Sequence, residues 1–251
     1  MRDNDQMTVV KHLSELRKRI VWVLAVFVMT FLAGLYFAGP IIEYLKLVPM
    51  EEGVPIISLH PSDALRIYMQ FSMLVGAVAT LPVALYHTWR FVSVGLNDHE
   101  RRMTLFFIPI AFFLFVGGVL FGYYIVFSMM MKFLTGMSTQ MGVTPHYGIA
   151  AYFDFMFQLV IPIGVLFELP IVVMFLTRLR ILNPMVLVKM RRFAYFGLTV
   201  VTFILTPPEL VTEILVTIPL LLLYELSIWL SRAVYRKQLK EDEKWKTNHA
   251  V

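Results

Sequence analysis

The chain has 251 residues, 59% apolar and 16% charged, and its mean hydropathy of +0.73 excludes an ordinary soluble domain. Its net charge is +5, but the basic residues lie in short segments beside long apolar stretches, so lipid headgroups and membrane topology explain them better than nucleic acid does. The absence of cysteine excludes disulfides, thiol catalysis and thiolate metal sites.

Six long stretches are almost free of charge, which predicts an all-α membrane protein with six transmembrane helices. Of the 22 Lys and Arg residues, all but Lys46, Arg66 and Lys132 fall on the same side of these stretches as the termini. The positive-inside rule therefore predicts cytoplasmic N and C termini. The stretches are residues 20–38, 67–89, 103–131, 155–177, 193–205 and 214–230.

We expect a single integral membrane domain over residues 1–251. Residues 1–19 form a cytoplasmic amphipathic start, because Leu13, Leu16 and Ile20 recur at helical spacing. The six-helix bundle covers residues 20–230, and residues 231–251 form a charged cytoplasmic tail that is helical at first and then frayed. No cleavage pattern follows the polar start, so the first helix is expected to remain in the mature protein.

The lengths and prolines of the stretches predict an irregular bundle. The outer loop 39–63 has four prolines and is expected to hold at most a short helix at 41–47. The last two stretches span only roughly 20 and 26 Å, so the final two helices are predicted to be short. Gly118 and Gly122 permit close helix contact, and we favour packing within the chain over dimerisation. Prolines predict kinked helices around a concave, glove-like surface: Pro82, Pro109, Pro162, Pro170 and Pro219.

Two carboxylates fall inside apolar stretches. Glu168 lies nine residues, or about 13 Å, from the inner end of its stretch, where an acidic side chain is costly. Glu168 either makes a structural polar contact or belongs to a surface that faces another protein's helix. We favour the second alternative. Glu225 lies five residues from the inner end of the last stretch, where pairing with a loop arginine is an open structural alternative to a place in the same groove.

Glu15 and Glu100 form a second candidate site, on the cytoplasmic side. In the structural interpretation, Glu15 forms an ion pair with Arg19 at i,i+4, and Glu100 is an ordinary solvated charge in a loop. Alternatively, both carboxylates bind a paired guanidinium motif, since planar guanidinium groups bind carboxylates through two hydrogen bonds. The many nearby Lys and Arg residues oppose this reading unless they point toward lipid phosphates.

No catalytic motif is visible, so we expect no enzyme, no cofactor and no metal site. The six histidines form no H-E-x-x-H pair, and neither a G-x-S-x-G elbow nor a Walker-type loop occurs. Energy for work would then come from outside the chain, for example from an ion gradient. A secondary transporter with Glu168 as carrier carboxylate is the rival function, although paired repeats of broken helices are not visible. A membrane enzyme is a more distant alternative.

The residues 12–19, His-Leu-Ser-Glu-Leu-Arg-Lys-Arg, resemble the H-L-x-E-L-R-x-R start of TatC, the multispanning subunit of the twin-arginine protein translocase. Four further blocks agree in the same order, so the resemblance extends from about residue 8 to 232. These blocks are Leu81-Pro82-Val83 through Trp89-Arg90-Phe91, His99-Glu100-Arg101-Arg102, Phe167-Glu168-Leu169-Pro170, and Thr206-Pro207-Pro208 with Ile218-Pro219 and Tyr224-Glu225.

The resemblance implies a receptor in the bacterial inner membrane that binds twin-arginine signal peptides of folded cargo. It implies single-span TatA and TatB partners, self-association in the receptor complex and dependence on the protonmotive force. The signal-peptide site would comprise Glu15, Glu100, Arg17, Arg19 and Phe91. A membrane groove for a partner would comprise Glu168, Pro170 and Glu225, with Glu209 and Tyr123 as outer-loop candidates.

The sequence departs from the family pattern on the outer side. Glu209 stands where Asp is expected after the proline pair, and Glu213 stands where Gln is usual. Asp63 and Ala64 replace the Glu and Pro that the family tends to have. These differences leave the predicted fold unchanged but put the role of the last outer turn in question.

Overall fold

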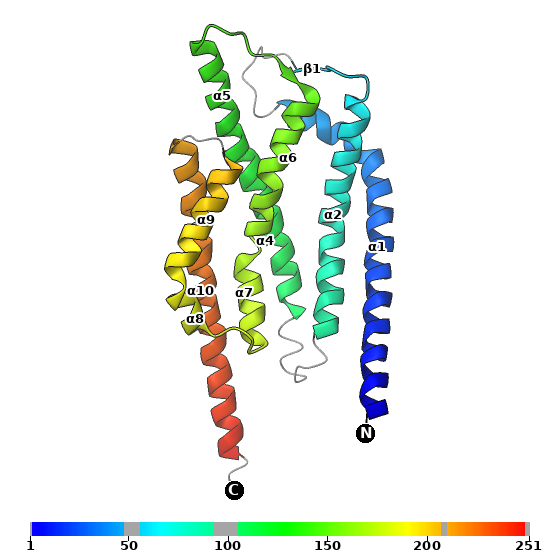
Figure 1. The fold of residues 1–251 in the computed structure, drawn as a ribbon, viewed down its shortest axis with the longest axis vertical. Coiled ribbons are helices and arrows are strands. Elements are labelled where there is room, and N and C mark those ends of the chain that lie inside the picture. The colour runs from blue at the N-terminus through cyan, green and yellow to red at the C-terminus, as the bar shows by residue number, and fades with distance from the viewer. Residues whose placement is uncertain (1, 48–55, 93–104, 207–209, 249–251) are drawn as a thin grey trace. The chain divides into compact units, whose positions relative to one another are not determined.

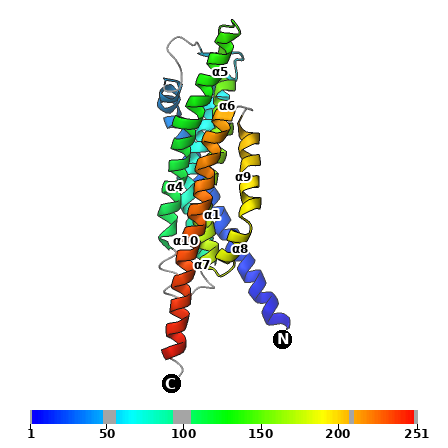
Figure 2. The same ribbon diagram turned by 90° about the vertical axis from the view of Figure 1, so that its left-hand side faces the viewer.

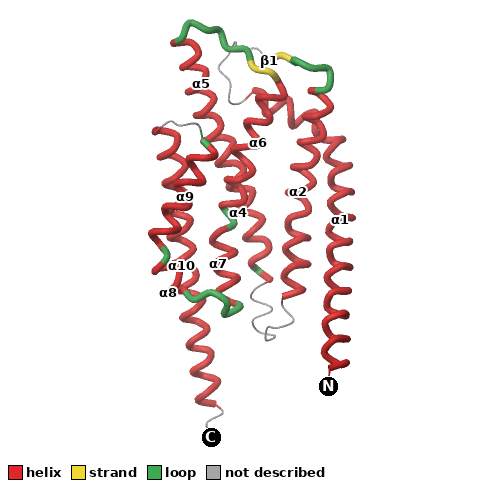
Figure 3. The backbone as a smooth tube through the Cα atoms, viewed as in Figure 1, coloured by secondary structure: helices red, strands yellow, loops and turns green. Residues whose placement is uncertain are grey.

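A computed structural model of the chain describes residues 2–47, 56–92, 105–206 and 210–248, with backbone only for 2–13, 47, 91–92, 210–212 and 240–248. The described backbone is almost entirely helical, with a single pair of two-residue strands (Figure 3). Its contacts divide the chain into two compact units, residues 1–47 with 58–108, and residues 48–57 with 109–251.

The first unit is a pair of long helices, α1 (Arg2–Leu47) and α2 (Asp63–Val92), which lie side by side (Figure 1). Glycines allow the close approach: a Cβ on Gly34 would lie 3.0 Å from Ser72 Cα, and one on Gly76 would lie 3.2 Å from Phe31 Cα. The Thr30 hydroxyl lies 3.0 Å from the Thr80 hydroxyl across the same interface. Small residues and hydroxyls thus hold two apolar helices together where lipid weakens the hydrophobic effect between them.

The second unit contains the remaining helices. Its first half consists of α4 (Phe107–Phe121), the π-helix η2 (Gly122–Phe127), α5 (Ser128–Gln140) and α6 (Ile149–Leu166). Strand β1 (Ile56–Ile57) pairs in parallel with β2 (Tyr147–Gly148), with Ile56 opposite Tyr147. Its second half consists of α7 (Leu169–Arg178), α8 (Pro184–Lys189), α9 (Arg191–Leu205) and α10 (Leu210–Asn248).

Glycines also bring α4 and η2 against α6. A Cβ on Gly118 would lie 2.7 Å from Phe167 Cβ and 2.9 Å from Gly164 Cα, and one on Gly122 would lie 3.2 Å from Val160 Cα. The prediction that these glycines serve packing within the chain is therefore confirmed. Val126, Ile163, Val216 and Leu220 form a fully buried cluster that joins these helices to α10.

The described helices include five that are long and apolar enough to cross a membrane: Ser14–Lys46, Asp63–Arg90, Phe107–Gln140, Ile149–Arg178 and Glu213–Leu239. The predicted helix at 193–205 is present as α9, but its 15 residues make it shorter than these five. The chain is a multi-pass membrane protein, and its count of six transmembrane helices stays a prediction, as do the single domain, the concave shape and the cytoplasmic termini.

Two predicted helix boundaries were wrong. The outer loop does not begin at residue 39, because α1 continues through Pro40 to Leu47 and changes direction near this end (Figure 1). The last helix is not short: α10 has 39 residues, because no glycine or proline interrupts the charged segment after residue 230. The charged tail therefore continues the last helix to Asn248, beyond the apolar stretch (Figure 2).

Asp63, one of the departures from the family pattern, has a clear structural role at the start of α2. Its Oδ2 accepts hydrogen bonds from the backbone N–H groups of Leu59 and His60, at 2.9 and 3.0 Å. The side chain is buried, with 5% of its surface exposed. Asp63 therefore fixes the turn that leads into α2.

Candidate functional site

The cytoplasmic candidate Glu15 lies on α1, where its carboxylate pairs with the Arg19 guanidinium one turn later. The predicted i,i+4 ion pair is therefore present. Arg19 is itself buried and also donates from Nη1 to the backbone carbonyl of His87 on α2, at 3.0 Å. Arg19 thus anchors an exposed carboxylate to the neighbouring helix.

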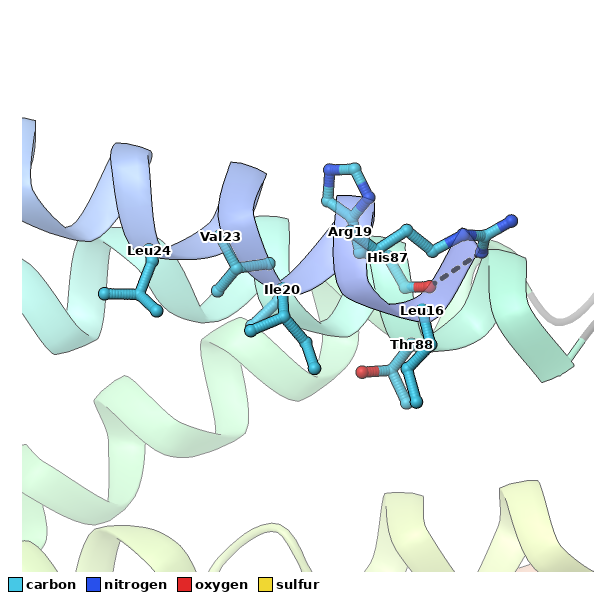
Figure 4. Close-up of a pocket in the computed structure, with 8 residues that line it drawn as sticks. Leu16, Arg19, Ile20, Val23, Leu24, His87 and Thr88 are labelled. Atoms are coloured by element: carbon cyan, nitrogen blue, oxygen red, sulfur yellow. Dashed lines mark hydrogen bonds between the residues drawn. The ribbon is translucent and has the colours of Figure 1, made fainter. Parts of the chain in front are cut away.

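A cavity of about 290 Å³ lies next to this ion pair, between α1 and α2 (Figure 4). Its wall is mostly aliphatic, with the polar groups of Arg19, His87 and Thr88 along it (Figure 4). The sequence did not predict this cavity or the hydrogen bond from Arg19 to the His87 carbonyl, because the two residues are 68 positions apart in the chain. The cavity is lined by Leu16, Arg19, Ile20, Val23, Leu24, Ala84, His87 and Thr88.

The structure describes the other residues of the predicted cytoplasmic site only in part. Arg17 lies on α1 and is exposed, whereas Arg19 is buried. Phe91 is in the last turn of α2, but its side chain lies outside the described part of the chain. Glu100 lies outside the described residues altogether. The structure therefore brings Glu15 and Arg19 together and leaves their relation to Glu100 a prediction.

Glu168, the membrane candidate, sits where a long helix breaks. Helix α6 ends at Leu166 and α7 begins at Leu169, so residues 167 and 168 form the turn between them. Pro170 has no N–H to donate to the carbonyl of Leu166, which explains an interruption at this point. The Glu168 carbonyl instead accepts from Ile171 N and Val172 N, at 3.1 and 3.0 Å, and starts α7.

One carboxyl oxygen of Glu168 is buried without a hydrogen-bond partner among the described residues. This oxygen, Oε1, is shielded from solvent. The neighbouring Phe167 packs against Phe121, with ring centroids 5.5 Å apart and the rings tilted by 34°, and lies close to Gly118. A buried polar oxygen without a partner costs about 1–3 kcal/mol, so a carboxyl group at this position requires a partner, a water molecule or protonation.

Glu225 has partners within the second unit. Its Oε2 accepts from Arg191 Nη2 at 2.7 Å, and its Oε1 accepts from the Tyr195 hydroxyl. Tyr224 donates to the Leu187 carbonyl at 2.9 Å and packs edge-to-face on Tyr195. The predicted pairing of Glu225 with an arginine is confirmed, although Arg191 is the first residue of α9 and not a loop residue. This cluster joins α8 and the start of α9 to the middle of α10.

Of the two residues predicted to act in an outer loop, the structure describes only Tyr123. Tyr123 is not in a loop: it lies in η2, is 5% exposed and stacks on Phe127 with centroids 6.1 Å apart. Its place in a continuous apolar stretch explains why the helix runs through it. Glu209 lies outside the described residues.

Comparisons with known proteins agree with this arrangement. The profile of the family described as "Sec-independent protein translocase protein (TatC)" matches residues 11–219. The chain is 45% identical over 234 residues to a Sec-independent protein translocase protein TatC of Halalkalibacterium halodurans, covering 93% of this chain and 92% of that protein. It is also 45% identical over 236 residues to TatCy of Bacillus subtilis, with 94% and 93% covered.

A solved structure has the same fold. The crystal structure described as "Twin Arginine Translocase Receptor- TatC" superposes with a TM-score of 0.75 at 35% identity. The match covers 89% of this chain and 99% of that one. Sequence and fold therefore agree along nearly the whole chain.

Proposed function

Because the chain belongs to the TatC family of Sec-independent protein translocase proteins, we propose that it is the receptor for twin-arginine signal peptides of folded proteins. It is a multi-pass translocase component of a transporter type, not an enzyme. We place it in the bacterial cytoplasmic membrane, with both termini inside and α9 as a short sixth transmembrane helix. Transport is driven by the protonmotive force.

The exposed carboxylate of Glu15 carries this proposal. Glu15 and Glu100 together bind the two guanidinium groups of the signal peptide through charge-assisted hydrogen bonds. Arg19, buried and bonded to the His87 carbonyl, holds Glu15 in place. Arg17 and Phe91 complete the binding site. The resemblance of residues 12–19 and 99–102 to the family's signal-peptide motifs supports these roles.

The partner surface is centred on Glu168. TatA and TatB type single-span subunits present a helix to the turn between α6 and α7, where a polar side chain contacts the half-buried carboxyl group of Glu168. Pro170 maintains the two-residue interruption between α6 and α7, and Glu225 joins α10 to α9 through Arg191. The chain also self-associates in the receptor complex. Glu209 has a role toward the outer side.

Changing Glu168 tests the partner surface. We expect Glu168→Ala to reduce copurification of a single-span partner about tenfold, because one charged or polar contact at a buried interface contributes about 1.4 kcal/mol or more. Recovery of a precursor with intact arginines is measured in the same purification and should not change. Gln158→Ala, an exposed polar position on α6, is the control. Equal partner recovery with Glu168→Ala and with the control would rule out this surface.

A further inference from the structure

The short helix α8 and the start of α9 carry an apolar surface on their outer side. Met185 is 74% exposed and Phe193 is 73% exposed, although both are large apolar side chains. Of the six residues of α8, five are apolar and the sixth is Lys189. A loop helix that faced water would have polar residues on its outer side, so this surface is suited to an apolar surrounding. The four exposed residues that we call the α8 face are Met185, Val186, Met190 and Phe193.

Helical spacing gathers the α8 face and two cationic residues on one side. The hydrogen bonds from Met190 N to Val186 O and from Ala194 N to Met190 O, both 2.9 Å long, continue the helical repeat from α8 into α9. At about 100° per residue, the exposed positions fall within roughly 160° of the helix circumference. Lys189 and Arg192, both exposed, therefore lie among the apolar side chains. The positions on this side are 185, 186, 189, 190, 192 and 193.

The opposite side of α8 is fixed to α9 and α10, beside which it lies (Figure 1). Asn183 begins the helix, since its Oδ1 accepts a hydrogen bond from Met185 N at 3.0 Å. The Leu187 carbonyl accepts from the Tyr224 hydroxyl of α10 at 2.9 Å. Leu187 and Val188 pack against a buried cluster formed by Leu198, Tyr224 and Ile228. The α8 face therefore cannot turn inward without breaking these contacts.

The position of α8 in the chain keeps it close to the membrane surface. The candidate span Ile149–Arg178 ends where α7 ends, and α9, which we propose as the sixth transmembrane helix, begins at Arg191. The segment between them contains only α8 and its short flanking pieces. Neither Lys189 nor Arg192 pairs with a carboxylate among the described side chains. Exposed apolar residues with cationic ones among them are typical of a helix that lies in the membrane interface.

We propose that the α8 face lies in the membrane interface and binds anionic phospholipids. Its apolar side chains contact the upper parts of the acyl chains, and Lys189 and Arg192 reach the headgroup phosphates, because long cationic side chains keep their stems on apolar surface and their charge in a polar layer. The two cations favour lipid over an apolar helix of another protein, since burial against such a helix would leave both charges unpaired. The contact holds the end of α9 that begins at Arg191 at the level of the headgroups.

Fluorescence quenching in vesicles tests this surface. The chain has no cysteine, so Val186→Cys provides a single site for a fluorescent label on the full chain. The labelled chain is reconstituted into phosphatidylcholine vesicles with and without phosphatidylglycerol, and quenching is measured with a nitroxide on the upper acyl chain of a lipid and with neutral acrylamide in water. We expect the lipid nitroxide to quench the label strongly, and more strongly when phosphatidylglycerol is present. Lys189→Gln with Arg192→Gln should remove the difference between the two kinds of vesicle, since it removes both cations.

Three further variants serve as references. A label at Leu222→Cys reports an exposed apolar position of α10, and a label at Thr144→Cys reports an exposed loop position. Lys132→Gln removes an exposed cation of α5 and should keep the phosphatidylglycerol effect at Val186→Cys. Acrylamide quenching at Val186→Cys as strong as at Thr144→Cys would overturn the proposal. Shielding from both quenchers would overturn the lipid assignment in favour of a second protein, and a phosphatidylglycerol effect that persists without the two cations would contradict their role.

Discussion

Replacing both cytoplasmic carboxylates, Glu15→Gln with Glu100→Gln, is expected to weaken binding of a twin-arginine signal peptide about 100-fold. Each charge-assisted hydrogen bond contributes about 1.5 kcal/mol or more, so the loss of two corresponds to roughly this factor. The measurement is the affinity of a labelled peptide for the purified chain at fixed salt, because surface charge pairs weaken with ionic strength.

Two comparisons make this result specific. Glu43→Gln removes an exposed carboxylate near the other end of α1 and should leave the peptide affinity unchanged. A peptide whose arginine pair is replaced by lysines should bind the wild type weakly and should not discriminate between the wild type and the double variant. If the double variant still bound the arginine peptide as tightly as the wild type, the docking role of these carboxylates would be wrong.

Gly118→Ala should lower the stability of the second unit by about 1–3 kcal/mol, the usual cost of overpacking a tight core. The new Cβ would lie 2.7 Å from Phe167 Cβ and 2.9 Å from Gly164 Cα, so a helix backbone or the Phe167 side chain must move. At about 2–4 °C per kcal/mol, Tm in detergent should fall by several degrees.

The adjacent glycine is a matched control. A Cβ on Gly117 meets nothing within 4 Å, so Gly117→Ala should leave Tm unchanged or raise it slightly, since alanine favours helix. Because Phe167 precedes Glu168, Gly118→Ala should also reduce partner copurification. Equal Tm values for the two variants would contradict the close packing of α4 on α6.

The positions of the helices and the energetic cost of placing Glu168 inside the membrane could be predicted from the sequence. A membrane limits the length of every span and the charges that it can carry. The pair Glu15 and Arg19 could be predicted as well, since i,i+4 spacing is local. The link from Arg19 to the His87 carbonyl could not, because it depends on the register of α1 against α2, which glycine contacts set.

Helix ends were the least predictable features. Pro40 lies inside α1 and Pro219 inside α10, whereas the helix before Pro170 breaks. The residue type is the same at these positions, so tertiary packing decides whether a proline bends a helix or ends it. The tail was predicted to be helical at first and then frayed. Its helical start is confirmed, but the helix continues as far as Asn248.

Export in intact cells tests the central proposal most directly. A folded reporter with a twin-arginine signal peptide is followed by fractionation in cells that lack this gene and any homologue, with and without a plasmid that restores the chain. We predict that export stops in the deletion strain, returns with the wild-type chain, and does not return with the Glu15→Gln, Glu100→Gln variant. Undiminished export without the gene would contradict the account.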